Sequence, residues 1–190
     1  MDSESLKAAL VKALQSHAGG VIMMELPAED YFEANAAAVA QLAEDGFEGV
    51  YISFQRPFGN VSGMLKQRGV DTGKIIFIDV ATALGEEEHE KHSRCIHISR
   101  EVSVDELVRA VHTGLRRLGG KKKFVFIDSL TTITLHKPLS ESMRFYEFLV
   151  STAKVGESGL VLVLSVAKEL RQKRFIEDVA VHADEVIGVQ

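Results

Sequence analysis

The sequence predicts an α/β fold with three layers, α/β/α, around a central and mainly parallel sheet. Strand-length apolar runs alternate with helix-like segments of about 10 to 15 residues, a pattern typical of βαβ crossovers. The runs FVFID (124–128) and LVLVLSV (160–166) are almost continuously apolar, as expected for strands covered on both faces. No repeat, low-complexity tract or linker interrupts the pattern. We therefore expect one domain over residues 1–190, with an N-terminal helix at 1–18 and a core at 20–190.

Local signals place the elements of the first half of the chain. Ser3 or Ser5 can cap a first helix, and glycine follows its last apolar position. Pro27 separates a buried strand from an Ala-rich helix, which Gly46 ends. The expected elements are a helix from Ser3 or Ser5 to Gly19-Gly20, strands at 21–26, 50–54 and 75–79, a helix at 31–45, and a short helix from Asn60 or Ser62 to Gly69.

Similar signals place the elements of the second half. Ser103 precedes a run with helical spacing and Glu106 stands three residues later, so the two predict a capping box. An acidic loop that contains histidines leads into the short apolar run CIHI. The expected elements are strands at 95–98, 124–128, 160–166 and 185–189, and helices at 104–118, 140–155 and 174–184.

Composition limits the classes of function. Hydrophobic residues make up 46% of the chain and charged residues 26%, the balance of an ordinary globular protein. The net charge of -5 argues against nucleic-acid binding, which needs concentrated Lys and Arg. A single cysteine, Cys95, excludes an internal disulfide framework and fits a reducing compartment. Without a signal peptide or a membrane-length apolar run, we expect a cytoplasmic protein that does not enter a membrane.

The turn after the first strand raises a question about phosphate binding. In nucleotide-binding α/β proteins this turn holds phosphate on backbone N–H groups at a helix N-terminus. Here it has neither glycine nor lysine and carries Glu29, Asp30 and Glu33, with Glu25 in the strand before it. An exposed carboxylate near a helix N-terminus contributes about 0.3–1 kcal/mol of stability. We therefore expect these acidic side chains to satisfy the helix dipole in place of a nucleotide.

Three segments resemble the RecA-like P-loop ATPases of the KaiC and RadA type. KKFVFIDSLTTI (122–133) resembles their Walker B strand, in which four apolar residues run into Asp and then Ser. The segment 46–79 is similar to their second strand, helix and third strand, and HADEVIGV (182–189) to their last core strand. The resemblance covers roughly residues 20 to 190 and implies a RecA-like fold (the P-loop NTPase fold).

The same resemblance implies an ATP and Mg²⁺ site, from which this sequence departs. A Walker A loop, G-x-x-x-x-G-K-[ST], should occupy the region from Leu26 to Asn35, where the chain reads LPAEDYFEAN. Relatives hold the Mg²⁺ shell with the aspartate that corresponds to Asp128, which Ser129 follows. Without a P-loop, we favour a structural role for Asp128, in which it caps the next segment or binds backbone N–H groups.

A second departure follows the second strand. KaiC-like ATPases usually carry acidic residues there, one of which polarises the attacking water, whereas this chain has Gln55 and Arg56. Glutamine can orient a water molecule but is not a general base. The loss of both the phosphate cradle and the base argues against conventional ATP hydrolysis, and we expect no catalytic residue.

A cluster of possible metal ligands lies in GEEEHEKHSRCIH. Its members are His89, His92, Cys95 and His97. Thiolate and imidazole together would favour Zn²⁺ or a similar ion. Their spacing matches no standard zinc motif, and the flanking acids are typical of a solvated loop, so a bound metal is the minor interpretation.

The leading functional expectation is a degenerate, non-catalytic ATPase homologue that acts as a regulatory or protein-interaction module, without a cofactor. It would pair with itself or with another protein, an expectation that rests on analogy at the level of fold. One alternative is a nucleotide-binding protein that uses Asp128, Ser129, Arg56 and Gln55 in a rearranged or interface-shared site with Mg·ATP. Another is a metal- or redox-responsive regulator that uses the cluster at 89–97.

Overall fold

The computed structural model describes residues 3–17, 19–84, 92–155, 159–167 and 174–188. Within these residues, seven strands form one sheet in which every pairing is parallel. The strands are β1 (Val21–Leu26), β2 (Glu48–Ser53), β3 (Ile75–Asp79), β4 (Cys95–His97), β5 (Lys123–Asp128), β6 (Leu160–Ala167) and β7 (Glu185–Gly188). Their order across the sheet is β4-β3-β2-β5-β6-β1-β7, so β5 lies at the centre.

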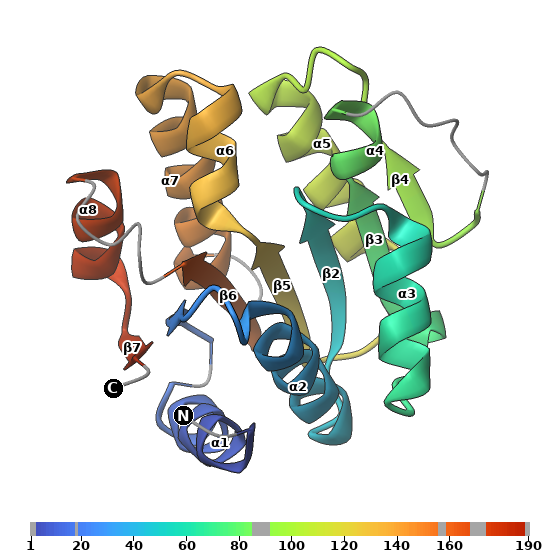
Figure 1. Cartoon of the computed structure of the whole chain (residues 1–190), viewed down its shortest axis with the longest axis vertical. Coiled ribbons are helices and arrows are strands. Elements are labelled where there is room, and N and C mark those ends of the chain that lie inside the picture. The colour runs from blue at the N-terminus through green and yellow to red at the C-terminus, as the bar shows by residue number, and fades with distance from the viewer. Residues whose placement is uncertain (1–2, 18, 85–91, 156–158, 168–173, 189–190) are drawn as a thin grey trace.

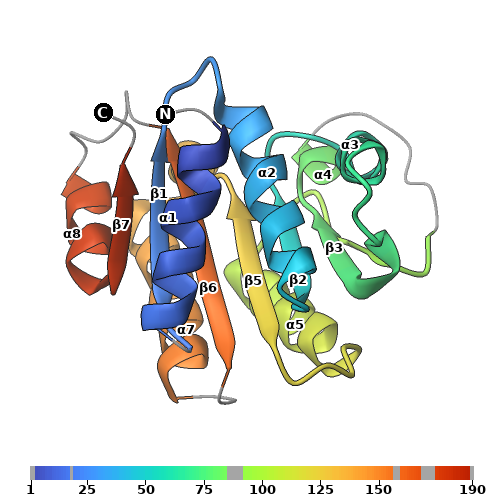
Figure 2. The same ribbon diagram turned by 90° about the horizontal axis from the view of Figure 1, so that it is seen from below.

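Helices cover both faces of this sheet (Figure 1). Seen from below, α1 and α2 lie in front of the strands and α5 and α7 behind them (Figure 2). None of the described helices combines the length and the apolar character needed to cross a membrane. The helices are α1 (Ser3–Ser16), α2 (Tyr31–Glu44), α3 (Phe58–Gln67), α4 (Ala81–Leu84), α5 (Val104–Arg116), α6 (Leu130–His136), α7 (Leu139–Val155) and α8 (Arg174–His182), with a 3-10 turn at Thr72–Lys74.

Each face of the sheet has its own hydrophobic core, because successive strand residues point to opposite faces. In β2, Val50 and Ile52 join the core under α5, α6, α7 and α8. Tyr51 points the other way, into the core under α1, α2 and α3. The predicted three-layer α/β/α fold with a parallel sheet is therefore confirmed.

Two short helices, α4 and α6, differ from the expected elements, and α3 begins earlier than expected. α6 contains several threonines, whose branched side chains disfavour helices, but Leu130 and Ile133 are buried and anchor it. α3 begins at Phe58, whose amide donates to Oδ2 of Asp79 at 2.9 Å. Asp79 lies 21 residues further along the chain, at the end of β3. The residues around Phe58 therefore carry no local signal for the start of the helix.

The capping box predicted at the start of α5 is half correct. Ser103 Oγ accepts a hydrogen bond from the Glu106 amide at 3.2 Å, as a capping box requires. The Glu106 carboxylate does not complete the box, because it accepts hydrogen bonds from the amide and hydroxyl of Ser99 instead. The loop after β4 is thereby tied to the helix that follows it.

Candidate functional site

A buried carboxylate lies at the carboxyl end of the central strand, the edge where ligands bind in parallel sheets of this kind. Asp128 ends β5 and is fully buried. Its Oδ2 accepts a hydrogen bond from the Tyr51 hydroxyl of β2 at 2.6 Å. Its Oδ1 accepts one from Nδ2 of Asn35, in the second turn of α2, at 3.1 Å. The carboxylate is thus held by side chains from a neighbouring strand and from the helix above it.

Asn35 extends this network to a third strand. Its Oδ1 accepts a hydrogen bond from the Ser165 hydroxyl of β6 at 2.8 Å, so its amide is satisfied at both ends. Asn35 and Ser165 are both fully buried. The chain of contacts from Ser165 to Tyr51 therefore ties α2 to β2, β5 and β6 where a Walker-type site would open.

Tyr31, the first residue of α2, closes the network from above. Its side chain is 6% exposed, and its hydroxyl lies near the side chains of Asn35, Ser129 and Ser165. Among the described residues, none satisfies hydrogen-bond geometry with that hydroxyl. A buried hydroxyl without a hydrogen-bond partner lowers the stability of the fold. The Tyr31 hydroxyl is therefore destabilising, whereas the other polar groups of the site have partners.

Burial is the main cause of the shifted pKa values at this site. Loss of hydration raises the pKa of Asp128 from 3.8 to about 6, against the hydrogen bond from Tyr51, the charge of Arg56 and the hydrogen bond from Asn35. Burial, with the Asp128 charge as a second cause, also raises the pKa of Tyr31 and of Tyr51. Both phenols therefore remain protonated at neutral pH, and Tyr51 remains a donor to the carboxylate.

The acidic turn does not cap α2 in the way the sequence suggests. Asp30 occupies the N-cap position, but its backbone is helical (φ -101°, ψ 0°) and its side chain makes no capping hydrogen bond. A capping side chain usually needs an extended backbone at this position. Glu29 is exposed, and Glu33 pairs with Arg68, the C-cap residue of α3. Glu25 lies on β1 between Met24 and Leu26, so its side chain faces away from α2.

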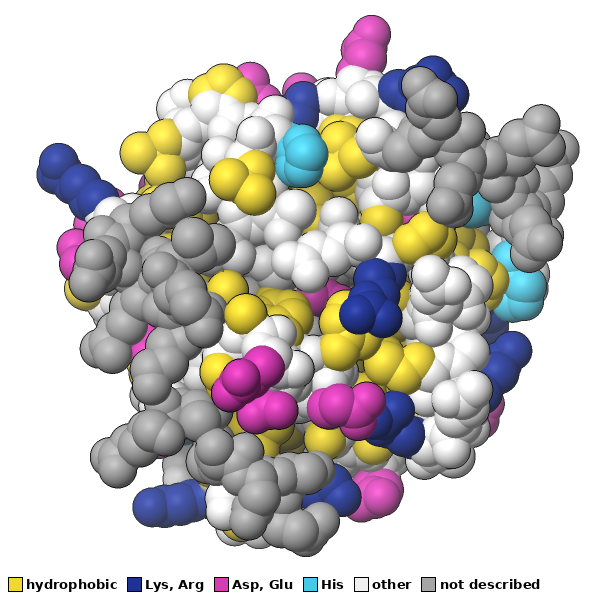
Figure 3. All heavy atoms as spheres, viewed as in Figure 1, with side chains coloured by type: hydrophobic (Ala, Val, Ile, Leu, Met, Phe, Trp, Pro, Cys, Tyr) yellow, Lys and Arg dark blue, Asp and Glu magenta, His cyan; other side chains and the backbone are white. Residues whose placement is uncertain are grey.

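Gln55 and Arg56 border the Asp128 network from outside. Both are exposed after the end of β2. The Arg56 guanidinium lies over the Phe32 ring, 3.0 Å from its centroid, as a cation–π contact. Gln55 Nε2 donates to Oγ1 of Thr132 at 3.0 Å. On the face drawn in Figure 3, the basic side chains of the described residues are scattered beside acidic ones and form no broad patch.

Ser129 is buried at the N-cap position of α6, and its peptide bond to Asp128 is cis. Its hydroxyl forms hydrogen bonds with those of Thr131 at 2.6 Å and Thr132 at 3.2 Å. The expectation that Asp128 caps this segment or binds backbone N–H groups is therefore wrong about its partners. The hydroxyl cluster lies at the start of α6, whereas the Asp128 carboxylate binds Tyr51 and Asn35.

The possible metal ligands are only partly brought together. Cys95 and His97 lie on the same face of β4, with Sγ 3.9 Å from Nδ1. His92 is exposed, and its ring packs 4.8 Å from that of Phe58. His89 lies outside the described residues. Burial, with the nearby charge of Asp79 as a second cause, raises the pKa of the Cys95 thiol to about 12.

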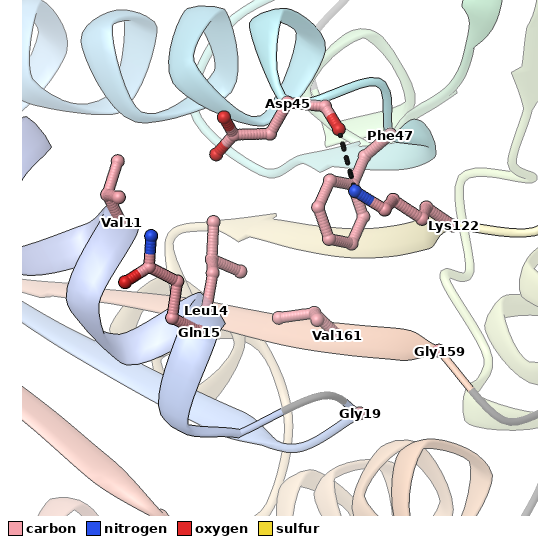
Figure 4. A pocket seen from close by; sticks show the side chains of 9 residues that line it. All are labelled: Val11, Leu14, Gln15, Gly19, Asp45, Phe47, Lys122, Gly159 and Val161. Carbon is pink, nitrogen blue, oxygen red and sulfur yellow. Dashed lines mark hydrogen bonds between the residues drawn. The ribbon is translucent and has the colours of Figure 1, made fainter.

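A pocket of about 380 Å³ lies at the opposite, amino-terminal edge of the sheet (Figure 4). Figure 4 shows Val11 and Leu14 of α1 facing Phe47 and Val161 across it. The Lys122 ammonium group donates a hydrogen bond to the Asp45 carbonyl oxygen at 3.2 Å, so it already has a partner. The pocket therefore offers an apolar gap between α1 and the strand starts, away from the Asp128 network.

No protein-family model matches this chain, and no curated protein matches it in sequence. Solved structures do match. An uncharacterised protein from Pyrococcus horikoshii, solved with an unknown peptide, has a TM-score of 0.66 and 15% identity over 94% of this chain and 82% of its own. A KaiC-like protein from Pyrococcus horikoshii OT3 has a TM-score of 0.58 and 18% identity over 91% and 74%. The chain has the RecA-like, KaiC-type fold.

The flagellar accessory protein FlaH from Methanocaldococcus jannaschii shares this RecA-like fold, with a TM-score of 0.56 and 11% identity over 90% of this chain and 71% of its own. At such identities the likeness concerns the fold alone. The predicted resemblance to KaiC-type domains is therefore confirmed at that level.

Sequence reasoning identified Asp128 but missed the residues that surround it. Asn35 and Ser165 carried a usable signal, because each is a polar residue on an otherwise apolar stretch. Tyr31 and Tyr51 carried no such signal. Tyrosine is common in helices and strands, where its ring is buried and its hydroxyl often reaches water.

Proposed function

We propose that this chain is a non-catalytic homologue of the RecA-like ATPases, a pseudo-ATPase that acts through contacts with proteins. The proposal rests on the burial and the hydrogen bonding of the Asp128 carboxylate. This group is fully buried, and each of its oxygens already accepts a hydrogen bond from a neighbouring side chain. A hydrated Mg²⁺ ion could reach the carboxylate only if the side chains that bury it, Tyr51 and Asn35 among them, moved aside.

The charged side chains around the N-terminus of α2 support the same proposal. Glu29, Asp30 and Glu33 stand around the start of α2, where a polyphosphate would lie. Arg68 is paired with Glu33, and Arg56 lies on the Phe32 ring. The exposed carboxylates of Glu29 and Asp30 repel an anion over a few ångströms, so the N-terminus of α2 becomes a poorer phosphate site.

Calorimetric titration with Mg·ATP and Mg·ADP, up to millimolar nucleotide, tests the proposal. We expect no saturable heat and no rise in melting temperature, for the native chain and for Asp128→Asn alike. Saturable micromolar binding would overturn the proposal. If Asp128→Asn and Arg56→Ala abolished that binding, the nucleotide would lie in the rearranged site of the alternative hypothesis, whereas binding that both variants kept would lie elsewhere.

Protein contact is the positive half of the proposal. The uncharacterised Pyrococcus horikoshii protein of the same fold was solved with an unknown peptide, which supports peptide or protein binding by fold likeness. Large apolar side chains are also exposed at the junction of α6 and α7, with Leu135 at 65% and Leu139 at 52%. Sedimentation velocity over a range of protein concentrations should give a discrete oligomer that nucleotide does not change. An oligomer that forms only with Mg·ATP would contradict a nucleotide-independent role.

A further inference from the structure

Three potential metal ligands of different chemistry converge at the edge of the sheet formed by β3 and β4. A carboxylate oxygen of Asp79, Sγ of Cys95 and a ring nitrogen of His97 all lie within 4.8 Å of one another. Asp79 and His97 are direct partners in the register of the two strands, and Cys95 lies two residues before His97. The parallel pairing therefore brings all three to one face, which α3 covers.

Local hydrogen bonds fix the orientation of the Asp79 carboxylate. Its Oδ2 accepts from the Thr82 hydroxyl at 2.6 Å and from the Phe58 amide at 2.9 Å, and its Oδ1 accepts from the Thr82 amide at 2.9 Å. A carboxylate has about four lone-pair positions, so one remains on Oδ1. Metal-binding carboxylates are commonly fixed by outer hydrogen bonds of this kind.

The separations are close to those of a tetrahedral site. With a bond of about 2.3 Å to sulfur and about 2.0–2.1 Å to nitrogen, a zinc ion holds these two atoms about 3.5 Å apart. Sγ of Cys95 and Nδ1 of His97 are 3.9 Å apart in the structure. A small rotation of either side chain would close the difference.

We propose that Asp79, Cys95 and His97 bind a borderline-soft divalent cation, of which Zn²⁺ and Co²⁺ are the fitting examples. Sulfur and imidazole ligands disfavour Mg²⁺ and Ca²⁺, which take oxygen ligands. The Cys95 thiol gives its proton to solvent as the metal–sulfur bond forms. A water molecule completes the coordination. The ion would fasten the edge strand β4 to β3, a role separate from the Asp128 network and independent of the proposed function.

Titration of the chelator-treated full chain with Co²⁺ tests this site. Cys95 is the only cysteine in the chain, so a thiolate-to-cobalt charge-transfer band can arise from this site alone. We expect one equivalent of Co²⁺ to produce that band together with the intense visible absorption of tetrahedral cobalt, and Zn²⁺ to displace it. Absence of the band at millimolar Co²⁺ would overturn the proposal, whatever the variants do.

Matched histidine variants locate the ligand. His97→Asn should weaken Co²⁺ binding by more than the roughly 10- to 100-fold that loss of an outer hydrogen bond costs. His112→Asn is the control, because His112 packs against Phe148 of α7 under the other face of the sheet. Equal cobalt affinity in the two variants would contradict the assignment. Cys95→Ser should remove the charge-transfer band while circular dichroism shows that the fold is kept.

Discussion

The Tyr51 hydroxyl and Oδ2 of Asp128 are joined by a 2.6 Å hydrogen bond, although the two residues lie 77 positions apart in the chain. The bond is buried, and its acceptor is a carboxylate, the kind of partner that strengthens a hydrogen bond. Tyr51→Phe should therefore lower the free energy of unfolding by about 1.5–3 kcal/mol, because the carboxylate loses a donor that water cannot replace. Urea denaturation measures the change.

Tyr146→Phe provides the matched control for that variant. Tyr146 is equally buried, but its hydroxyl donates to a neutral acceptor, the Val179 carbonyl oxygen, at 2.9 Å. Its loss should cost about 0.5–1.5 kcal/mol. If the two variants lost the same stability, the bond to Asp128 would not be charge-assisted.

Tyr31→Phe should behave in the opposite way to Tyr51→Phe. The Tyr31 hydroxyl is buried without a hydrogen-bond partner among the described residues, so its removal relieves a desolvation cost. We expect unchanged stability or a gain of up to about 1 kcal/mol in urea denaturation. A loss of more than about 1 kcal/mol would mean that this hydroxyl has a bonding partner in solution, such as an ordered water.

Asp128 should give stability a defined pH dependence. Its pKa rises from 3.8 to about 6 on folding, so between these values the folded state holds more protons than the unfolded state. The contribution of this group to stability is therefore present at low pH and is lost as pH rises from about 4 to about 6. At about 1.36 kcal/mol for each pKa unit, the change is about 3 kcal/mol.

Asp128→Asn isolates that contribution, because an amide does not titrate. The free energy of unfolding of the native chain, relative to that of Asp128→Asn, should fall by that amount between pH 4 and pH 7. Chemical denaturation of both proteins across this range measures the difference. A difference that does not vary with pH would show that the carboxyl keeps its ordinary pKa.

Gly49 is required by the packing of the sheet. It pairs with Phe124 in the register of β2 and β5, and a Cβ atom at Gly49 would overlap the Phe124 ring. Gly49→Ala should therefore cost about 1–3 kcal/mol through overpacking. Thermal and urea denaturation measure the loss, and adding Phe124→Leu should recover part of it if the ring is the cause.

Gly63→Ala is the control for this substitution. Gly63 lies within α3, and a Cβ atom there would have no neighbour within 4 Å. The change should raise stability by about 0.5–1 kcal/mol, because alanine loses less backbone entropy in a helix. Similar losses at Gly49 and Gly63 would mean that the Phe124 contact is not responsible.

The sequence predicted the order of most elements, including the central strand that ends at Asp128. Apolar runs such as FVFID and LVLVLSV mark strands because burial on both faces favours apolar side chains at most positions. The absence of glycine and lysine between Leu26 and Asn35 is likewise visible in the sequence. Both are local properties, since each depends only on residues close together in the chain.

The tertiary structure alone decided what surrounds Asp128. Its partners Asn35 and Tyr51 lie 93 and 77 residues away, and the sequence pattern does not encode which side chains meet at that distance. The start of α3 and the grouping of Asp79 with Cys95 and His97 were decided in the same way, by the register of β3 and its neighbours. Hydrogen bonding and burial at these positions depend on which strands become neighbours, whereas secondary-structure signals depend on neighbours in sequence.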